Sequence, residues 1–337
     1  MSAHVRAAVL THYFEVAASL KLDTRPLLRR VGLSKDMLAD PEQRIPAIAA
    51  LQLLEASAEA AHCPTFGLRM AELRQLADLG SISLLLAHQR TLRDVLNTSI
   101  HYRQLLNESL AMQIEEAGKF VIVREELVVE GCSALRQANE LALGVFSRLC
   151  RALLGPHWQP ESVHFTHEAP ADLQVHRRLF KCRLAFTSEF NGVVCAAADL
   201  NLPNPAADPA MATYARRFIE SLPGAHERSV VLEARKAIYL LLPMGRANIE
   251  HTARGLRLTV RTLQRQLDEA GEVFSDLVTG VRRDLAQVYL AVPKYSLGQI
   301  AALLGYSVQS SFTRWFTAEF GMTPASWRSR HKQAKKT

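Results

Sequence analysis

A chain of 337 residues with 48% hydrophobic and 22% charged residues has the length of about two domains and the composition of an ordinary globular protein. The net charge is +7, because residues 243–337 hold 14 Lys and Arg against 7 Asp and Glu, whereas the first 242 residues hold 26 of each. A positive charge concentrated in one segment favours a nucleic-acid partner. The chain has no run of 18 apolar residues and its amino end carries polar residues throughout, so we expect neither a membrane span nor a signal peptide.

The five cysteines lie far apart in the sequence, at Cys63, Cys132, Cys150, Cys182 and Cys195. No C-x-x-C pair occurs and the number is odd, which predicts reduced thiols rather than a disulfide framework. Buried structural thiols are the expected case, and a redox sensor is the alternative. We therefore expect a cytoplasmic protein.

Residues 1–110 are predicted to be a succession of helices. Val5, Val9, His12 and Val16 have the spacing of one helical face, so a first helix is expected there. Further amphipathic segments follow, each introduced by a glycine or a capping hydroxyl, at 48–61, 66–76, 81–88 and 91–106.

The hydrophobic period then changes. Residues 110–116 and 120–129 alternate apolar with polar side chains around Gly118, which predicts an antiparallel hairpin. Short strands are expected at 162–166, 183–187 and 192–196, and helices at 133–154 and 171–182. The mixture indicates an α+β amino-terminal domain over 1–205. A run with three prolines ends it, and helices at 211–222 and 228–242 are expected to form a helical linker over 206–242.

The stretch from Ser296 to Gly321 has the pattern of a helix-turn-helix. Ser296 is a good helix N-cap, an apolar stripe follows it, and Gly305 stands where the chain must turn sharply. A second apolar stripe includes Phe312 and Phe316. The opposite face of that second helix offers side chains able to hydrogen-bond base edges and phosphates: Gln309, Ser310, Ser311, Thr313 and Arg314. An ordinary αα-hairpin in a core is the alternative interpretation.

Residues 249–271 repeat this plan. An apolar-spaced helix is followed by a break, by Thr259 as an N-cap, and by a helix whose exposed face holds Arg261, Gln264 and Arg265. Between the two blocks, residues 276–292 keep their apolar side chains on one helical face and are expected to form a connector helix. The sequence therefore predicts an all-α DNA-binding domain over 243–331 with two helix-turn-helix motifs, followed by a basic tail at 332–337 that adds nonspecific attraction.

These blocks carry a family resemblance. The segments TLQRQLDEAG, VRRDLAQVYL and IAALLGYSVQSSFTRWFTAEFGMTPASWR resemble the double-motif DNA-binding domain of AraC/XylS-type transcriptional regulators, over residues 246–330. The resemblance implies that each motif places its second helix in the major groove, with both helices on one face of double-stranded DNA. It matches the first reading helix at Arg261, Gln264 and Arg265, and the second at Gln309, Ser310, Ser311 and Arg314.

The chain departs from the family pattern at two places. Arg257 stands where the family usually has glycine, and a left-handed conformation there strains the backbone by roughly 1 kcal/mol. The first motif is therefore expected to turn differently or to hold DNA less firmly. After Phe316 the family often has basic residues, but this chain has Thr317, Ala318 and Glu319, so one phosphate contact is expected to be missing.

The first region resembles the arabinose-binding-like effector domain of the same regulators. The resemblance covers residues 5–205 and depends on DLGSISLLLAHQRTLRDVLN, VHFTHEAP and HRRLFKCRLAF before DLNLPNP. Because that domain type serves many inducers, the resemblance does not name a sugar. His101, Tyr102 and Arg103 end a helix near the predicted sheet and are candidate effector contacts, with a structural role as the alternative. The family also implies a homodimer and contact with RNA polymerase.

The residues suggest no metal, cofactor or catalytic site. His164 and His167 are three apart, which in a strand places them on opposite faces, and no cysteine or carboxylate cluster accompanies them. Motifs of the G-x-S-x-G, P-loop, G-x-G-x-x-G and H-E-x-x-H types do not occur. We therefore expect a protein that is not an enzyme.

The preferred function is a sequence-specific transcription regulator, more an activator than a repressor, controlled by a small-molecule effector in the amino-terminal domain. One alternative is a ligand-independent regulator whose first domain is an oligomerisation or protein-contact platform. A more remote alternative is a DNA-repair alkyl transfer protein that uses one of the cysteines, although none of them stands in a context such as Pro-Cys-His.

Overall fold

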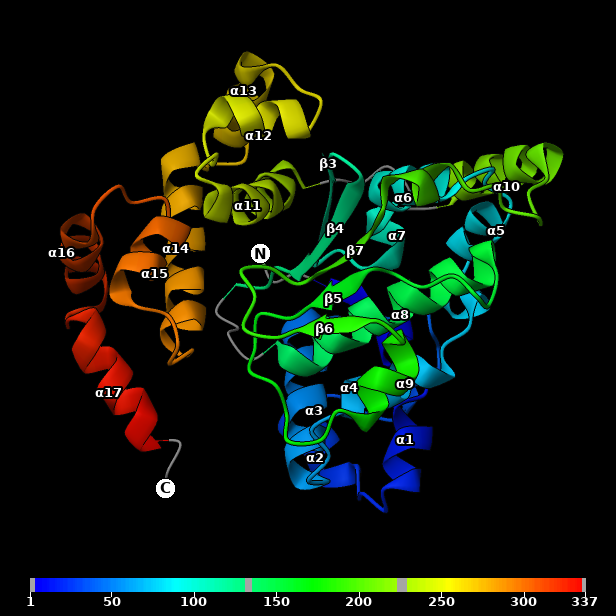
Figure 1. Cartoon of the computed structure of the whole chain (residues 1–337), viewed down its shortest axis with the longest axis horizontal. Coiled ribbons are helices and arrows are strands. Elements are labelled where there is room, and N and C mark those ends of the chain that lie inside the picture. The colour runs from blue at the N-terminus through cyan, green and yellow to red at the C-terminus, as the bar shows by residue number, and fades with distance from the viewer. Residues whose placement is uncertain (1–3, 131–134, 223–228, 335–337) are drawn as a thin grey trace. The chain divides into compact units, whose positions relative to one another are not determined.

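The computed structural model describes residues 4–130, 135–222 and 229–334. The chain divides into two compact units (Figure 1). The amino-terminal unit comprises Met1–Val129 and Ala134–Glu227, and the carboxyl-terminal unit comprises Glu130–Ser133 and Arg228–Thr337. Parts of the sequence analysis, at residues 132–134, 228 and 335–337, lie outside the described residues.

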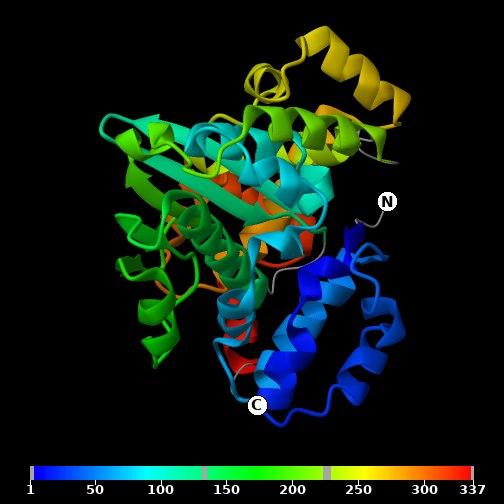
Figure 2. The same cartoon turned by 90° about the vertical axis from the view of Figure 1, so that its right-hand side faces the viewer.

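The amino-terminal unit is α+β, as predicted. Its α-helices are α1 (Tyr13–Ser19), α2 (Arg25–Arg30), α3 (Ala47–Ala60), α4 (Phe66–Leu73), α5 (Ile82–Ala87), α6 (Leu92–His101), α7 (Arg103–Leu106), α8 (Arg136–Leu154), α9 (Gln174–Phe180) and α10 (Pro209–Ser221). Short 3₁₀ helices occur at Ala7–Leu10, Asp36–Leu38, Leu76–Leu79 and Ala197–Asn201. In Figures 1 and 2 the helices α1 to α3, in blue, lie together at the end of this unit away from the hairpin of the sheet.

The predicted first helix is wrong. Strand β1 (His4–Arg6) pairs antiparallel with β2 (Arg44–Pro46), with Val5 opposite Ile45, and α1 begins only at Tyr13. Val5 and Val16 are both buried, but they belong to different elements. Helical spacing misled here because a segment that is buried on several sides shows apolar residues at many spacings.

The main sheet has five strands: β3 (Leu110–Ala117), β4 (Phe120–Leu127), β5 (Ser162–His164), β6 (Arg183–Ala185) and β7 (Gly192–Ala196). Their order is β3-β4-β7-β5-β6, with β5 and β6 parallel and the other neighbours antiparallel. The predicted hairpin around Gly118 and the three short strands are confirmed, although β5 and β6 end two residues earlier than predicted. The sheet therefore joins the chain's local hairpin to strands that come more than thirty residues later.

Helix α8 is the central packing element of this unit. It contacts β4, α3, α4 and α9, and its contact with α4 is the most extensive. A Cβ atom at Gly67 would lie 2.1 Å from the carbonyl oxygen of Gln137, and one at Gly144 would lie 2.5 Å from the Cβ of Ala71. Only glycine allows the two helices to come this close.

The predicted linker over 206–242 is not a separate element. Helix α10 packs on α5 and buries Ala215 and Ile219 against Ile82 and Leu85, so it belongs to the amino-terminal unit. Helix α11 (Val230–Leu241) instead contributes buried side chains to the core of the carboxyl-terminal unit. The physical reason is that each helix has an apolar stripe, which must be buried against a neighbour.

The described part of the carboxyl-terminal unit is helical. After α11 come α12 (Ile249–Gly255), α13 (Val260–Glu269), α14 (Phe274–Leu290), α15 (Leu297–Leu303), α16 (Gln309–Phe320) and α17 (Pro324–Ala334). One apolar core runs through these helices and includes Ile238, Leu263, Val281, Ile300 and Phe316, each 0% exposed. Within the described residues of the whole chain, no helix combines the length and the apolar character that a membrane span needs.

Candidate nucleic-acid interface and effector cavity

The two predicted helix-turn-helix motifs are α12–α13 and α15–α16. Their first helices have the same length of 7 residues, and each begins at a side-chain cap. The side chain of Asn248 accepts a hydrogen bond from the backbone N–H of His251. The hydroxyl of Ser296 accepts one from the backbone N–H of Gln299, and the Gln299 side chain accepts one from the backbone N–H of Ser296, which completes a capping box. Thr259 caps α13 in this way, whereas α16 follows Val308 without a side-chain cap.

The turns that end α12 and α15 also correspond. Arg257 has φ 57° and Gly305 has φ 74°, so both residues are left-handed. The N–H groups of Arg257 and the next residue donate to α12 carbonyls at 3.0 and 2.9 Å, and those of Gly305 and its successor donate to the matching α15 carbonyls at 2.9 and 2.8 Å. The first motif therefore turns as the second does, contrary to the expectation of a different turn, and Arg257 occupies the conformation that usually selects glycine.

Replacing Arg257 by glycine is expected to stabilise the carboxyl-terminal unit by up to about 1 kcal/mol, because glycine adopts this conformation without strain from a Cβ atom. Chemical denaturation followed by circular dichroism measures the change. Gly305→Ala is the matched control in the opposite direction. An added Cβ atom would lie 3.6 Å from its nearest neighbours, which is ordinary contact, so the expected loss of stability comes from backbone strain alone. If Arg257→Gly instead destabilises the unit, the arginine side chain contributes more to stability than its backbone strain costs.

The connector α14 holds the second motif and lies between the two motifs in Figure 1. Arg282 Nε donates to the carbonyl oxygen of Leu304 at 3.0 Å, and its guanidinium carbon lies 4.8 Å from the ring centroid of Tyr306. Arg283, the next residue, forms an ion pair with Glu319 of α16. Glu319 therefore stands where a phosphate contact was expected to be missing, and it is engaged within the unit.

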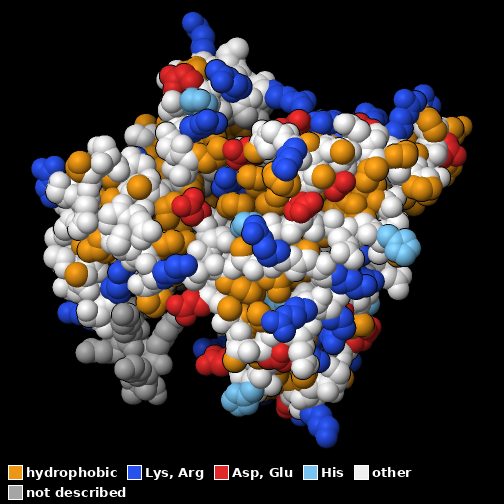
Figure 3. Space-filling view, in the orientation of Figure 1, with side chains coloured by type: hydrophobic (Ala, Val, Ile, Leu, Met, Phe, Trp, Pro, Cys, Tyr) orange, Lys and Arg blue, Asp and Glu red, His pale blue; other side chains and the backbone are white. Residues whose placement is uncertain are grey.

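The candidate DNA-reading residues face solvent while their neighbours form the core. On α13, Leu263 and Leu267 are buried, and on α16, Phe312 and Phe316 are buried. Among the candidates, Ser311 and Thr313 are half-buried, and six are exposed: Arg261, Gln264, Arg265, Gln309, Ser310 and Arg314. Arg265 Nη1 also lies 2.7 Å from Glu269 Oε1 on the same helix. Figure 3 shows Lys and Arg side chains over the α12–α13 motif.

A cavity of about 150 Å³, partly open to solvent, lies in the amino-terminal unit. Its walls come from β1, α3, the end of α4, α6, β3, β4 and α8, and most of them are aliphatic side chains such as Leu51, Leu54, Leu141 and Val145. The polar lining residues are few: Arg6, Arg74, Asp78, Ser99, Asn107, Ser109 and Glu125. Such a chamber, mostly apolar with a few polar groups, is the usual form of a small-molecule site.

The candidate effector contacts His101, Tyr102 and Arg103 are not among the residues that line this cavity. Tyr102 is buried with α5 and α10, and its hydroxyl donates to Glu220 Oε1 at 3.2 Å. Arg103 Nη1 donates to a backbone carbonyl at 2.7 Å, and His101 is exposed. Ser99, two residues before His101, does line the cavity, because residues two apart on a helix point to different faces.

Two adjacent carboxyls on β4 are buried. Glu126 accepts two hydrogen bonds from Asn191, from its backbone N–H and from its side-chain amide, both at 2.9 Å. Glu125 lines the cavity, and its Oε2 atom has no protein partner. Burial, with a smaller contribution from the charge of Glu126, raises the pKa of Glu125 to about 8. Glu125 therefore carries a proton at neutral pH and can donate a hydrogen bond into the cavity.

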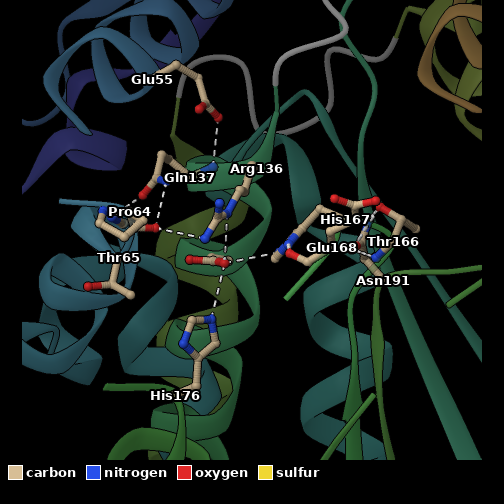
Figure 4. Close-up of polar contacts among 12 residues, drawn as sticks. Glu55, Pro64, Thr65, Arg136, Gln137, Thr166, His167, Glu168, His176 and Asn191 are labelled. Atoms are coloured by element: carbon tan, nitrogen blue, oxygen red, sulfur yellow. Dashed lines mark hydrogen bonds and ion pairs between the residues drawn. The ribbon is translucent and has the colours of Figure 1, made fainter. Parts of the chain in front are cut away.

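A second buried carboxyl, Glu140 of α8, collects three basic groups on one oxygen. Arg136 Nε, His167 Nε2 and His176 Nε2 lie 3.2, 3.0 and 3.2 Å from Glu140 Oε1. Figure 4 shows Arg136, His167 and His176 converging from three sides. Burial raises the pKa of Glu140, but the hydrogen bonds from the two histidines and the charge of Arg136 outweigh it and bring the pKa to about 2.

His164 and His167 do not share one site. His164 Nε2 lies 3.0 Å from Ser162 Oγ, whereas His167 faces Glu140. Within residues 4–130, 135–222 and 229–334, no group of three or more His, Cys, Asp and Glu side chains is arranged to hold a metal ion. The sequence reasoning missed Glu125 and Glu140. The signal for Glu125 was present, since two adjacent acids interrupt the apolar alternation of a strand.

Two helix-turn-helix motifs fixed by a connector helix, in a unit with excess positive charge, define a DNA-binding protein of the regulator class. Residues 252–330 match the helix-turn-helix domain family, and residues 22–204 match the family described as the arabinose-binding domain of AraC transcription regulator, N-term. The chain belongs to the AraC family of helix-turn-helix transcriptional regulators.

Curated relatives extend over nearly the whole chain. The HTH-type transcriptional regulator VirS of Mycobacterium tuberculosis is 31% identical over 96% of each chain, and the ornithine utilization regulator of Pseudomonas aeruginosa is 23% identical over 93% of each. The crystal structure of the transcriptional regulator CdpR from Pseudomonas aeruginosa covers 91% of this chain and 96% of its own, at 20% identity and a TM-score of 0.47.

Proposed function

We propose that this regulator reads promoter DNA with α13 and α16 and that a small-molecule effector in the amino-terminal unit controls it, more as an activator than as a repressor. The observation that supports DNA reading is the separation of faces: each of these helices buries its apolar stripe and leaves Arg and Gln side chains exposed. Arginine and glutamine make the bidentate contacts to guanine and adenine that carry sequence specificity in the major groove.

Replacing Arg314 by alanine is expected to weaken binding to the cognate duplex by roughly 1–3 kcal/mol, if its guanidinium bonds a base edge. Selection from a random-sequence duplex pool supplies the site, and fluorescence anisotropy supplies the affinities. Arg177→Ala is the matched control, because it removes the same charge from an exposed helical position in the other unit. An unchanged affinity for Arg314→Ala would show that Arg314 does not contact a base.

Effector control is supported by the cavity in the amino-terminal unit. A ligand that binds one conformation of the protein more tightly than another increases the population of that conformation. The ligand would thereby change where the protein lies on DNA or how it contacts RNA polymerase. The ligand-free platform is the second candidate. A DNA affinity and a melting temperature that no metabolite class changes would favour that platform.

We further propose a homodimer, supported by an exposed apolar stripe on α10. Met211, Tyr214 and Phe218 lie on one side of that helix and are 46, 67 and 50% exposed, and Leu84 of the neighbouring α5 is 51% exposed. Figure 3 shows hydrophobic side chains gathered over this region. Contiguous apolar surface of this kind marks interaction sites.

The double variant Tyr214→Glu and Phe218→Glu is expected to sediment as a monomer at concentrations where the wild type is a dimer, because the charges oppose burial of the stripe. Sedimentation velocity over a concentration series makes the measurement. Arg177→Glu introduces a negative charge at an exposed position of α9 and is expected to leave the dimer intact. A wild type that stays monomeric at every concentration would contradict the homodimer.

The alkyl-transfer alternative is not favoured by the thiols. Burial is the largest cause that raises the pKa of Cys150 well above its ordinary value, that of Cys182 to about 11 and that of Cys195 to about 12. A reactive cysteine needs the opposite shift, because the thiolate is the nucleophile. These thiols fit the structural role expected from the sequence. We also propose that the protein acts in the cytoplasm and associates with the bacterial nucleoid.

A further inference from the structure

The cavity in the amino-terminal unit gathers buried polar atoms that have no partner in the protein. Within the described residues, these atoms include Glu125 Oε2, the hydroxyl oxygens of Ser99 and Ser109, and the Nε atoms of Arg6 and Arg74. All five side chains line the cavity, and each is at least nine-tenths buried. A buried polar atom without a partner costs roughly 1–3 kcal/mol, so a cluster of them indicates that a bound molecule supplies the hydrogen bonds.

Each basic side chain that lines the cavity has an acidic neighbour. Arg6 Nη1 lies 2.7 Å from Glu42 Oε1, and its other terminal nitrogen donates to the carbonyl oxygen of Leu79 at 2.7 Å. Arg74 donates to the carbonyl oxygen of Val9 at 2.7 Å and experiences the negative charge of Asp78. Glu125 holds a proton at neutral pH, because burial raises its pKa to about 8. A charged ligand would therefore have to leave water for an apolar chamber whose basic side chains already have acidic neighbours, which is costly.

The size and walls of the cavity restrict its ligand further. A volume of about 150 Å³ is that of an engineered apolar protein cavity that accepts benzene. Aliphatic side chains of the strands β1, β3 and β4, of the helices α3, α7 and α8, and of two 3₁₀ helices cover most of the wall. A sugar carries a hydroxyl group on nearly every carbon, and each of these would need a partner in the cavity. Only three unpartnered oxygens line the described cavity, those of Glu125, Ser99 and Ser109, and they suit one or two such groups.

We propose that this cavity binds a small uncharged molecule about as large as one six-membered ring, apolar over most of its surface, with a hydroxyl or carbonyl group bonded by Glu125 and by the hydroxyls of Ser99 and Ser109. This inference depends on the proposed effector control and names the chemical class of the effector. It departs from the sugar that the name of the matched domain family mentions.

The test is calorimetric titration of the full-length protein at pH 7 with phenol, cyclohexanol and 1-hexanol as uncharged probes. Benzoate and benzylamine are matched probes of similar size with a negative and a positive charge, and L-arabinose is the polar counterpart. At least one uncharged probe is expected to bind saturably and to raise the melting temperature. The charged probes and arabinose are expected to bind at least tenfold more weakly.

Variants then locate the bound probe. Glu125→Leu and Ser99→Ala each remove a polar partner, and Ala142→Phe fills the chamber from α8. Each is expected to weaken binding of the best probe, by at least tenfold for Glu125→Leu and Ala142→Phe. Glu126→Gln is the control, since Glu126 is the adjacent buried carboxyl but does not line the cavity. Melting curves identify a variant that fails to fold, and the remaining variants then decide the location.

The outcomes separate this inference from the proposed function. Tighter binding of benzoate, benzylamine or arabinose would overturn the uncharged class and leave effector control standing. Binding that is unchanged in Ala142→Phe and Ser99→Ala would place the ligand elsewhere and overturn the assignment of this cavity. No binding by any probe would overturn the inference, and the DNA affinity of the same preparation independently tests the regulator function.

Discussion

Replacing Phe316 by alanine is expected to lower the free energy of unfolding of the carboxyl-terminal unit by about 3–5 kcal/mol, the usual cost of removing a large buried aromatic side chain. Phe316 is 0% exposed. Its ring centroid lies 4.2 Å from that of Phe320 in a stacked arrangement and 5.8 Å from that of Phe312. The variant loses these contacts and leaves a cavity under the second reading helix, because the surrounding core relaxes only in part.

The measurement is denaturant unfolding followed by circular dichroism, with DNA affinity recorded below the unfolding midpoint. Thr317→Ala is the matched control, since Thr317 is the exposed next residue of α16 and its hydroxyl bonds only within the helix. We expect Phe316→Ala to lose specific DNA binding together with the structure of the unit. A wild-type unfolding curve would show that the ring does not support the second motif.

Replacing Glu140 by glutamine is expected to destabilise the amino-terminal unit by about 3 kcal/mol at pH 7. This value follows from the pKa of Glu140, which is about 2 in the folded protein and has an ordinary value of 4.5. The amide can still accept a hydrogen bond, but it leaves the charge of Arg136 without its buried counterion. Glu168→Gln is the control, because Glu168 is exposed and follows His167 directly.

The effect has a defined pH dependence. The pKa of Glu140 is lower in the folded protein than in the unfolded chain, so the unfolded chain binds more protons between the two values. The stabilisation is therefore fully present above about pH 4.5 and is lost as the pH falls toward 2. The difference in unfolding free energy between wild type and Glu140→Gln is expected to shrink over this interval. A difference that stays constant from pH 7 to pH 3 would show that Glu140 is not held ionised by this cluster.

The sequence by itself determined the DNA-binding half, because its signals are local. A cap at Ser296, an apolar stripe and a left-handed turn at Gly305 lie within one short stretch, and α15–α16 follows them closely. The hairpin around Gly118 was predictable for the same reason. The turn at Arg257 was harder to predict, because the residue type argues against the conformation and only the bonds to the end of α12 show that it is adopted.

Only the tertiary structure decided the other features, since they depend on contacts between residues distant in sequence. Val5 lies in a strand because Ile45 pairs opposite it. Helices α10 and α11 belong to different units because their apolar stripes pack into different hydrophobic cores. The cavity joins Arg6, Ser99 and Glu125, which are separated by 93 and 26 positions along the chain. No local pattern encodes such a site, because the burial that keeps Glu125 protonated is produced by helices and strands from the whole amino-terminal unit.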